Sequence, residues 1–174
     1  MSIRINTEDL RDEIQVLKIY DRVLLSGVVY TARDAAHKRI DALLTAGEEL
    51  PFALENAVIY YAGPTPTPKG RVIGSCGPTT SGRMDVYTPK LLDAGLACMI
   101  GKGQRSDEVI KAIKRNKALY LCALGGAGAL AASCVTDMQV IAFPELGCES
   151  VKRLVIKEFP LIVGIDALGN NVFI

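Results

Sequence analysis

The sequence has few residues that could build a metal or nucleophile site by themselves. His37 is the only histidine, and the five cysteines stand more than ten positions apart, so no CxxC, CxxxC or His/Cys cluster occurs. This spacing does not match a self-contained zinc or iron–sulfur site. A Ser-His-Asp or Cys-His system would depend on His37. We therefore expect this chain alone to bind no metal, and most of its cysteines to be buried, reduced thiols in apolar surroundings.

A strong charge of one sign and long hydrophobic runs are also absent. Lys and Arg total 20 against 19 Asp and Glu, which gives a net charge of +1, and no basic run or basic–aromatic patch occurs. No apolar stretch approaches the ~20 residues that cross a bilayer. Residues 1–10 are polar and include acids, unlike a signal peptide. These features predict no nucleic-acid partner, no membrane segment and a cytoplasmic location.

The residues that are present fit one domain with an aliphatic core. Of the 174 residues 49% are hydrophobic but only 6% are aromatic, and strand-like and helix-like segments alternate without a repeat or a linker. Strands are predicted at 22–30, 57–62, 71–76, 97–103, 119–124 and 138–143, with a final hairpin in 161–174 around Gly169-Asn170. Helices are predicted from Thr31 to Gly47 and at 88–96, 107–117 and 125–134. This pattern predicts a single α/β domain over residues 1–174.

Local signals mark some of these boundaries. Thr31 followed by Asp34 resembles a capping box, and Gly47 suits the end of the same helix. Ser106 is placed to cap the helix that follows it. Residues 63–70 read GPTPTPKG, and their prolines exclude regular structure.

The segment GSCGPTTSGRMD, residues 74–85, is the strongest candidate for chemistry. Its glycines allow the backbone to approach a ligand closely. The hydroxyls of Thr79 and Thr80 could bind oxygens, and the Arg83 guanidinium could take a carboxylate in two parallel bonds. The segment thus suggests an oxyanion site, with an ordinary glycine-rich turn as the alternative.

A second candidate is TARDAAHKR, residues 31–39. Arg33 and His37 are four residues apart near the predicted start of a helix, so they share a face. A helix N-terminus together with Arg33 would attract an anion. In the alternative reading Asp34 is only a capping acid and His37 packs beside the apolar stripe.

The third candidate, GLACMIGKG, resembles a phosphate loop but does not match one. Five residues rather than four separate Gly95 from Gly101, and Gly103 stands where Ser or Thr should hold magnesium. Residues 125–129 likewise fail the dinucleotide fingerprint. We exclude nucleotide binding, although Lys102, between two glycines after a buried strand, can still point into a cleft.

Taken together, several segments resemble one enzyme family. They are YTARDAAHKR, IYYAGP, GSCGPTTSGRMDVYTPKLLDAGL, MIGKGQRSDEV, GGAGAL and EFPLIVGIDALGN. These look like the C-terminal part of class I fumarases, and equally like the β subunits of two-subunit fumarases and of L-tartrate dehydratase. The resemblance covers the chain from about residue 12, and GPTTSGRMD followed by GKG is its most specific part.

The resemblance implies a swivelling β/β/α domain and a partner. In that family a separate α subunit, or the N-terminal domain of one-chain enzymes, holds a [4Fe–4S] cluster on three cysteines. Its open iron acts as a Lewis acid on the substrate hydroxyl. The implied assembly is α2β2, with no cluster held by this chain. Cys76 is then a packing residue, because one isolated cysteine cannot supply three ligands.

The resemblance also assigns roles to residues of this chain. Arg33 and Arg83 clamp the carboxylates of a small dicarboxylate substrate. Thr79 and Thr80 contact the substrate, with Thr79 as the candidate proton acceptor. A threonine hydroxyl is a weak base, so its alkoxide needs a nearby cation, for which Lys102 is the candidate.

The predicted function is reversible hydration of fumarate to (S)-malate by a hydro-lyase that requires an α subunit. His37 is at most a helper of the Arg33 site. Within the family the alternative substrate is L(+)-tartrate. From another class, the alternative is a stand-alone anion-binding or regulatory domain without catalysis.

Overall fold

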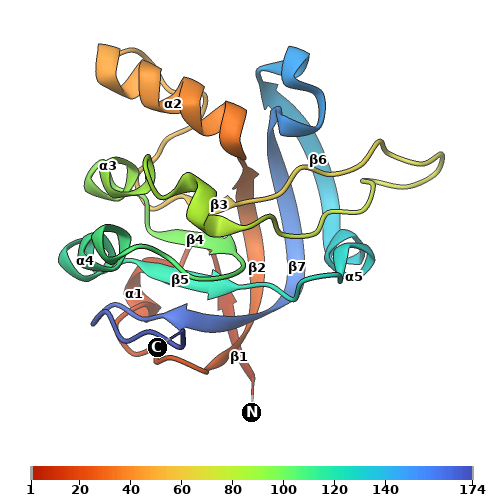
Figure 1. Ribbon diagram of the computed structural model, residues 1–174. Coiled ribbons are helices and arrows are strands. Elements are labelled where there is room, and N and C mark those ends of the chain that lie inside the picture. The colour runs from red at the N-terminus through yellow and green to blue at the C-terminus, as the bar shows by residue number, and fades with distance from the viewer. Residues whose placement is uncertain (1, 174) are drawn as a thin grey trace.

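The computed structural model describes residues 2–173, which form one seven-stranded sheet with helices packed around it (Figure 1). The strands are β1 (Ser2–Asn6), β2 (Arg22–Thr31), β3 (Val58–Tyr60), β4 (Cys98–Gly101), β5 (Leu119–Cys122), β6 (Val135–Ala142) and β7 (Val151–Ile165). The α-helices are α1 (Leu10–Glu13), α2 (Asp34–Ala46), α3 (Thr88–Asp93), α4 (Asp107–Asn116) and α5 (Gly128–Ser133), and the 3-10 helices are η1 (Ser81–Met84) and η2 (Pro144–Glu149). The predicted α/β class is confirmed.

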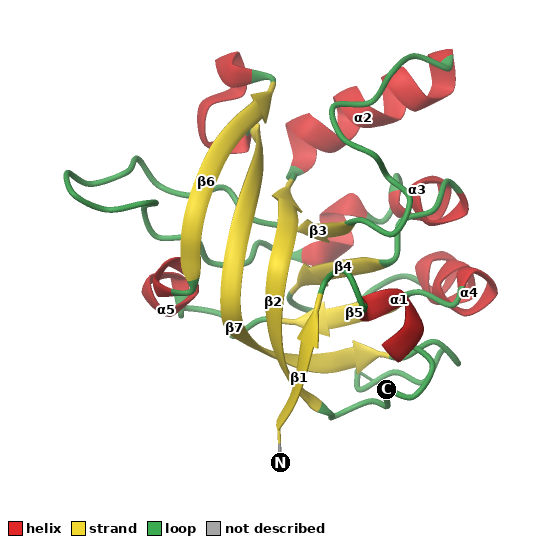
Figure 2. Cartoon of the chain, turned by 180° about the vertical axis from the view of Figure 1, so that it is seen from behind, coloured by secondary structure: helices red, strands yellow, loops and turns green. Residues whose placement is uncertain are grey.

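The sheet curls into two layers because its last strand is long. Strand order is β1-β2-β3-β4-β5-β7-β6, and β7 also pairs with β2, so β2, β3, β4, β5 and β7 form a closed ring. β1 to β5 run parallel, whereas β7 is antiparallel to β2, β5 and β6. Figure 2 shows β1, β2, β7 and β6 running across the direction of β3, β4 and β5. With α2, α3 and α4 outside β3–β5 (Figure 1), the layers are β/β/α.

Alternating side chains divide the core in two. Along β4 and β5, Ile100 and Leu121 point into the space between the two β layers. Their neighbours Met99 and Tyr120 point the other way, beneath the helices. Because both faces of these strands are buried, the strands read as continuous apolar runs.

Several local predictions are confirmed. β2 lies where residues 22–30 predicted a strand, and α2 ends at Gly47, whose φ of 67° is the left-handed conformation that favours glycine. Ser106 caps α4 by accepting a hydrogen bond from the Val109 N–H at 3.4 Å. At the end of the chain Ile165 pairs with Asn171 across a turn, as the predicted hairpin required.

Two local predictions are wrong. Thr31 does not cap α2, because it is the last residue of β2 and its Oγ1 accepts a hydrogen bond from the Lys152 N–H at 3.1 Å. Residues 71–76 form no strand. They return toward the body as one side of a projecting loop, closed at its base by Thr65 N–H donating to the Ser75 carbonyl at 3.0 Å.

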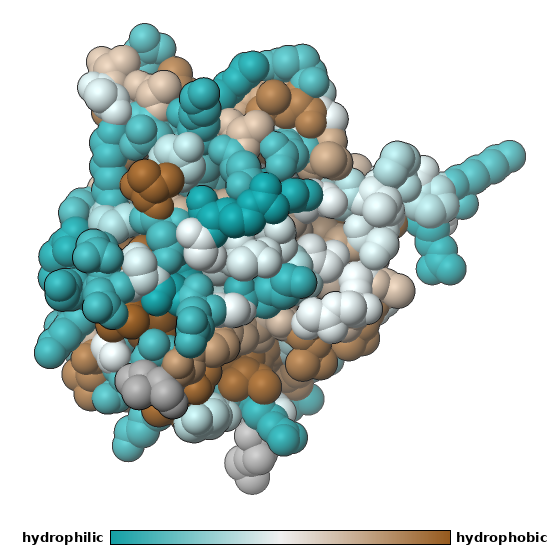
Figure 3. Space-filling model, in the orientation of Figure 1, coloured by the Kyte–Doolittle hydropathy of each residue, from teal (hydrophilic) through white to brown (hydrophobic). Residues whose placement is uncertain are grey.

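The projecting loop is the segment between β3 and the glycine-rich turn. Residues 65–72 are all exposed, and the loop stands out from the body in Figure 3. Its prolines explain the lack of regular structure, as predicted. No helix within residues 2–173 has the length and apolar character needed to cross a membrane.

Candidate active site

The predicted site residues lie at one edge of the sheet, where parallel strands end. β2 ends at Thr31, just before Arg33, and β4 ends at Gly101, just before Lys102. β3 lies between them and ends at Tyr60. Because adjacent parallel strands point the same way, their carboxyl ends share one edge, which is where open α/β sheets bind ligands.

The glycine-rich loop is hydrogen-bonded to the ends of β3 and β4. The Thr79 N–H donates to the Tyr61 carbonyl at 2.7 Å, and the Ser81 N–H donates to the Lys102 carbonyl at 2.9 Å. Thr80 and Lys102 pair in an isolated parallel bridge. Thr79 is half-buried and Thr80 is exposed. The structure therefore brings Thr79, Thr80 and Lys102 together.

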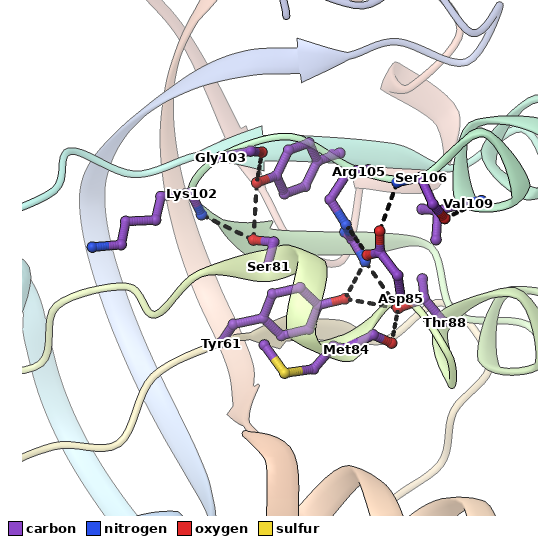
Figure 4. A network of polar contacts seen from close by, with 11 residues as sticks. Tyr61, Ser81, Met84, Asp85, Thr88, Lys102, Gly103, Arg105, Ser106 and Val109 are labelled. Carbon is purple, nitrogen blue, oxygen red and sulfur yellow. Dashed lines mark hydrogen bonds and ion pairs between the residues drawn. The ribbon is translucent and has the colours of Figure 1, made fainter.

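Ser81 fixes the junction between the glycine-rich loop and the end of β4. Its Oγ accepts from the Lys102 N–H at 2.9 Å and from the Tyr120 hydroxyl at 2.9 Å. A Cβ on Gly101 would overlap the Ser81 Oγ, so only glycine permits this approach. The Lys102 side chain runs toward Gly125 and away from the buried polar network (Figure 4). Within residues 2–173 its Nζ makes no hydrogen bond or ion pair.

The two predicted carboxylate clamps meet at one carboxylate of the chain itself. Asp34 Oδ1 lies 2.9 Å from Arg83 Nε, and Asp34 Oδ2 lies 3.9 Å from Arg33 Nη2. The Arg83 side chain is 54% exposed and the Arg33 side chain is 23% exposed. Two guanidinium groups are thus within reach of a single anion at an accessible edge of the molecule, which is the arrangement that binds carboxylates.

His37 lies inside the protein, next to the Arg33 backbone. Its side chain is fully buried, and its Nδ1 lies 2.9 Å from the Arg33 carbonyl oxygen. Tyr61 packs edge-on against the ring at a centroid distance of 5.3 Å. Burial lowers the pKa of His37 to about 4, so the ring is neutral at pH 7 and its Nδ1–H donates to Arg33.

We expect this buried histidine to make stability depend on pH. The unfolded chain takes up a proton near pH 6.5, whereas folded His37 does so only near pH 4. The free energy of unfolding is therefore unaffected above pH 6.5 and falls as the pH drops toward 4. Between pH 7 and pH 5 the loss should be about 2 kcal/mol.

Urea denaturation at pH 7 and pH 5 measures this loss. His37→Asn retains an N–H donor for the Arg33 carbonyl but does not titrate, so its unfolding free energy should change less over the same interval. An equal loss in the variant and in the wild type would assign the pH dependence to other groups.

A buried arginine holds the loop from inside (Figure 4). The Arg105 side chain is 0% exposed, and its Nε donates to Asp85 Oδ1 at 2.7 Å. Its Nη2 donates to Thr88 Oγ1 at 2.9 Å and to the Tyr61 hydroxyl at 3.2 Å. The guanidinium also lies over the rings of Tyr61 and Tyr120, at 5.2 and 5.0 Å. This network joins the end of η1 to α3, β3 and β5.

Sequence reasoning did not single out Arg105, Asp85, Ser81 or Glu149. Arg105 and Asp85 stand inside the quoted motifs MIGKGQRSDEV and GSCGPTTSGRMD, but nothing local distinguishes a buried arginine from a solvated one. Glu149 lies far along the chain from Arg33, yet its Oε1 is 3.4 Å from Arg33 Nε. No pattern of spacing in the sequence predicts that Glu149 and Arg33 meet.

The described residues do not fit an iron–sulfur cluster. Between residues 2 and 173, no group of three or more His, Cys, Asp or Glu side chains is placed to hold a metal ion. Cys76 is fully buried, and burial raises its pKa to about 12, so it is a packed thiol as predicted. Cys98 is also buried, Cys122 and Cys134 are partly buried, and Cys148 is exposed.

Comparison with known proteins decides the family. The sequence model of a protein family, described as the fumarase C-terminus, matches residues 1–174. The chain belongs to the fumarase C-terminal family. The motif residues lie around the strand ends: Arg33 follows β2, Lys102 follows β4, and the Thr79 N–H donates to the Tyr61 carbonyl after β3.

Individual relatives include fumarate hydratases and a protein named as a tartrate dehydratase subunit. Fumarate hydratase 2 of Leishmania major is 38% identical over 95% of this chain and 30% of its own length. The anaerobic class I fumarate hydratase of Escherichia coli is 36% identical over 95% of this chain and 31% of its own length. The chain thus spans about a third of these relatives. A Methanocaldococcus jannaschii protein, provisionally named L(+)-tartrate dehydratase subunit beta, is 38% identical over 94% of this chain and 87% of its own length.

Proposed function

We propose that this chain is the β subunit of a two-subunit class I fumarate hydratase, a hydro-lyase that interconverts fumarate and (S)-malate. The observation that carries the proposal is the meeting of Arg33 and Arg83 at Asp34. Similarity to fumarate hydratases supports the choice of reaction. The chain's part is to bind the dicarboxylate and to move a proton.

Arg33 and Arg83 bind the substrate carboxylates. Each guanidinium offers a pair of parallel N–H donors, which match a carboxylate in geometry and charge. Thr79 and Thr80 form the adjacent wall. Holding the substrate in one orientation turns an encounter into a positioned reaction, which contributes a large part of enzymatic rate.

Thr79 accepts the proton at C3 and Lys102 assists it. The parallel bridge between Thr80 and Lys102 places the lysine backbone one residue from Thr79. A nearby ammonium group stabilises an alkoxide and so raises the fraction of Thr79 that is deprotonated and able to accept the C3 proton. Electrostatic stabilisation of this kind acts most strongly in a site closed to water.

The remaining chemistry belongs to a partner. We propose an α subunit that holds a [4Fe–4S] cluster, in an α2β2 assembly. The name of the Methanocaldococcus jannaschii relative, a subunit beta, supports a partner chain, and the described residues of this chain do not themselves fit a cluster. When bound there, the cluster supplies a Lewis acid for the substrate hydroxyl. Swivelling of this domain against the α subunit stays a prediction.

An anaerobic assay of malate-to-fumarate conversion tests the assignment. The chain should be inactive alone and active when mixed with a cluster-bearing α subunit from the same source. Inactivity of the mixture with both malate and tartrate, with the cluster shown intact by its absorbance, would contradict the hydro-lyase assignment.

The second candidate substrate is L(+)-tartrate. Similarity over 87% of the length of the Methanocaldococcus jannaschii protein supports it. Comparing kcat/KM for malate and tartrate in the assembled enzyme decides between them, since tartrate carries one more hydroxyl that the site must accommodate.

A stand-alone anion-binding domain is the candidate from another class. Its support is the accessible arginine pair, which could bind an anion without a partner. Thermal unfolding of the isolated chain with fumarate, malate or phosphate tests it. A large rise in Tm with one of them, without any α subunit, favours a binder.

A further inference from the structure

Arg33 and Arg83 each direct the Nε side of the guanidinium toward a carboxylate of the chain. Arg83 Nε lies 2.9 Å from Asp34 Oδ1, and Arg33 Nε lies 3.4 Å from Glu149 Oε1. Glu149 attracts Arg33 by charge, since the buried Arg33 Nε makes no hydrogen bond within residues 2–173. Arg33 Nη2 lies 3.9 Å from Asp34 Oδ2, beyond hydrogen-bond distance, so its N–H donors can still bind another anion. The Nη end of a guanidinium binds a carboxylate in the bidentate, end-on manner.

Glu149 occupies the position that an anion at the start of α2 would take. Its Oε2 accepts a hydrogen bond from the Ala35 N–H, in the first turn of α2, at 3.2 Å. Its other oxygen faces Arg33. The two features predicted to attract a ligand, the helix N-terminus and Arg33, are therefore both engaged by one side chain from η2.

Glu149 is fixed rather than mobile. The buried Lys152 Nζ donates to the Ser150 Oγ at 2.7 Å and to the carbonyls of Gly147 and Cys148 at 3.2 Å each. These bonds tie the end of η2 to β7 on both sides of Glu149. A Cβ on Gly63 would come within 2.9 Å of Arg33 Cδ, so the backbone there also confines the arginine.

We propose that Glu149 is a positioning residue for substrate binding: it holds Arg33 by the Nε edge and directs its Nη groups toward the dicarboxylate. The inference rests on the proposed function, since it assumes that Arg33 binds substrate. Glu149 itself does not touch the substrate. Asp34 holds Arg83 in the same way, and the two carboxylates fix the relative orientation of the clamps.

The direction in which substrate affinity changes when Glu149 is neutralised separates positioning from simple electrostatics. Glu149 carries a negative charge near an anion site, so by Coulomb attraction alone its neutralisation should tighten substrate binding. Neutralisation should also tighten substrate binding if Glu149 competes with the substrate for Arg33. Positioning predicts the opposite, because an arginine freed at Nε loses its orientation.

Glu149→Gln in the assembled enzyme is the test. The glutamine amide oxygen can still accept from the Ala35 N–H, so the fold should be retained and Tm should stay within about 3 °C of wild type. We expect KM for fumarate and malate to rise about tenfold while kcat changes less than about twofold, as for a lost binding interaction.

Glu145→Gln is the matched control. Glu145 lies in the same 3-10 helix and pairs with Arg39, which has no predicted role. Its KM should equal that of the wild type. If Glu149→Gln fails to fold, Glu149→Asp replaces it, since the shorter side chain keeps the charge but withdraws from Arg33, and the same rise in KM is expected.

Each outcome decides one question. A KM for Glu149→Gln that falls, or that equals the Glu145→Gln value, overturns the positioning role. Absence of activity in the wild-type assembly instead overturns the proposed function, so the two failures are distinguished. A rise in KM confined to the Glu149 variants supports the inference.

Discussion

Replacing Arg83 by alanine is expected to lower kcat/KM of the assembled enzyme by at least about a hundredfold. A charge-assisted hydrogen bond contributes about 1.5–3 kcal/mol, and Arg83 can form two of them with one carboxylate. The Arg83 side chain is 54% exposed and, within residues 2–173, has one ion-pair partner, Asp34, so its removal should disturb the fold little. The loss should therefore appear in kinetics rather than in stability.

Steady-state kinetics with malate and fumarate measure this loss, and Arg115→Ala provides the matched control. Arg115 is 49% exposed and pairs with a single carboxylate, Asp93, away from the site. Arg83→Lys should recover little activity, because lysine keeps the charge but not the two parallel donors. Normal turnover by Arg83→Ala would remove Arg83 from the site and the proposed substrate with it.

Replacing Arg105 by methionine is expected to lower the free energy of unfolding by about 3–5 kcal/mol, the usual result of breaking a buried ion pair at one partner. Asp85, 14% exposed, would keep its charge without its partner. The Tyr61 and Thr88 hydroxyls would also lose a donor. The double variant with Asp85→Asn should recover part of the loss, since it removes the uncompensated charge.

Urea denaturation at pH 7 measures these changes, with Arg115→Met as the control for an exposed arginine–aspartate pair. The control should unfold near the wild-type midpoint because surface pairs contribute little. A small effect of Arg105→Met would show that the interior tolerates loss of the pair and that the loop from Thr79 to Arg83 is held mainly by its backbone bonds.

Candidate site residues could be proposed from the sequence, whereas the residues that support them could not. GPTTSGRMD and GKG pointed to Thr79, Thr80, Arg83 and Lys102 through a resemblance. The structure joins Thr79, Thr80 and Lys102 through backbone bonds at one edge of the sheet and pairs Arg83 with Asp34. Arg105 stood next to the same motif without a recognisable role. A side chain's burial depends on which strands and helices close around it, and residue type alone does not report that.

The local sequence determined the elements whose signals are local. The apolar run of β2, the glycine after α2 and the serine before α4 act within a few residues, so strand, helix end and cap could be predicted. The excess of aliphatic over aromatic residues likewise predicted the kind of core. The missing cysteine clusters and the balanced charge narrowed the possible functions before any fold was known.

Only the tertiary structure decided what depends on distant pairings. β7 closes the sheet by pairing with both β2 and β5, and that closure brings Glu149 beside Arg33, more than a hundred residues away in the chain. The same closure places the Thr31 hydroxyl beside β7, where it accepts a hydrogen bond from the Lys152 N–H and does not cap α2. These contacts follow from long-range strand register, which short-range sequence patterns do not encode.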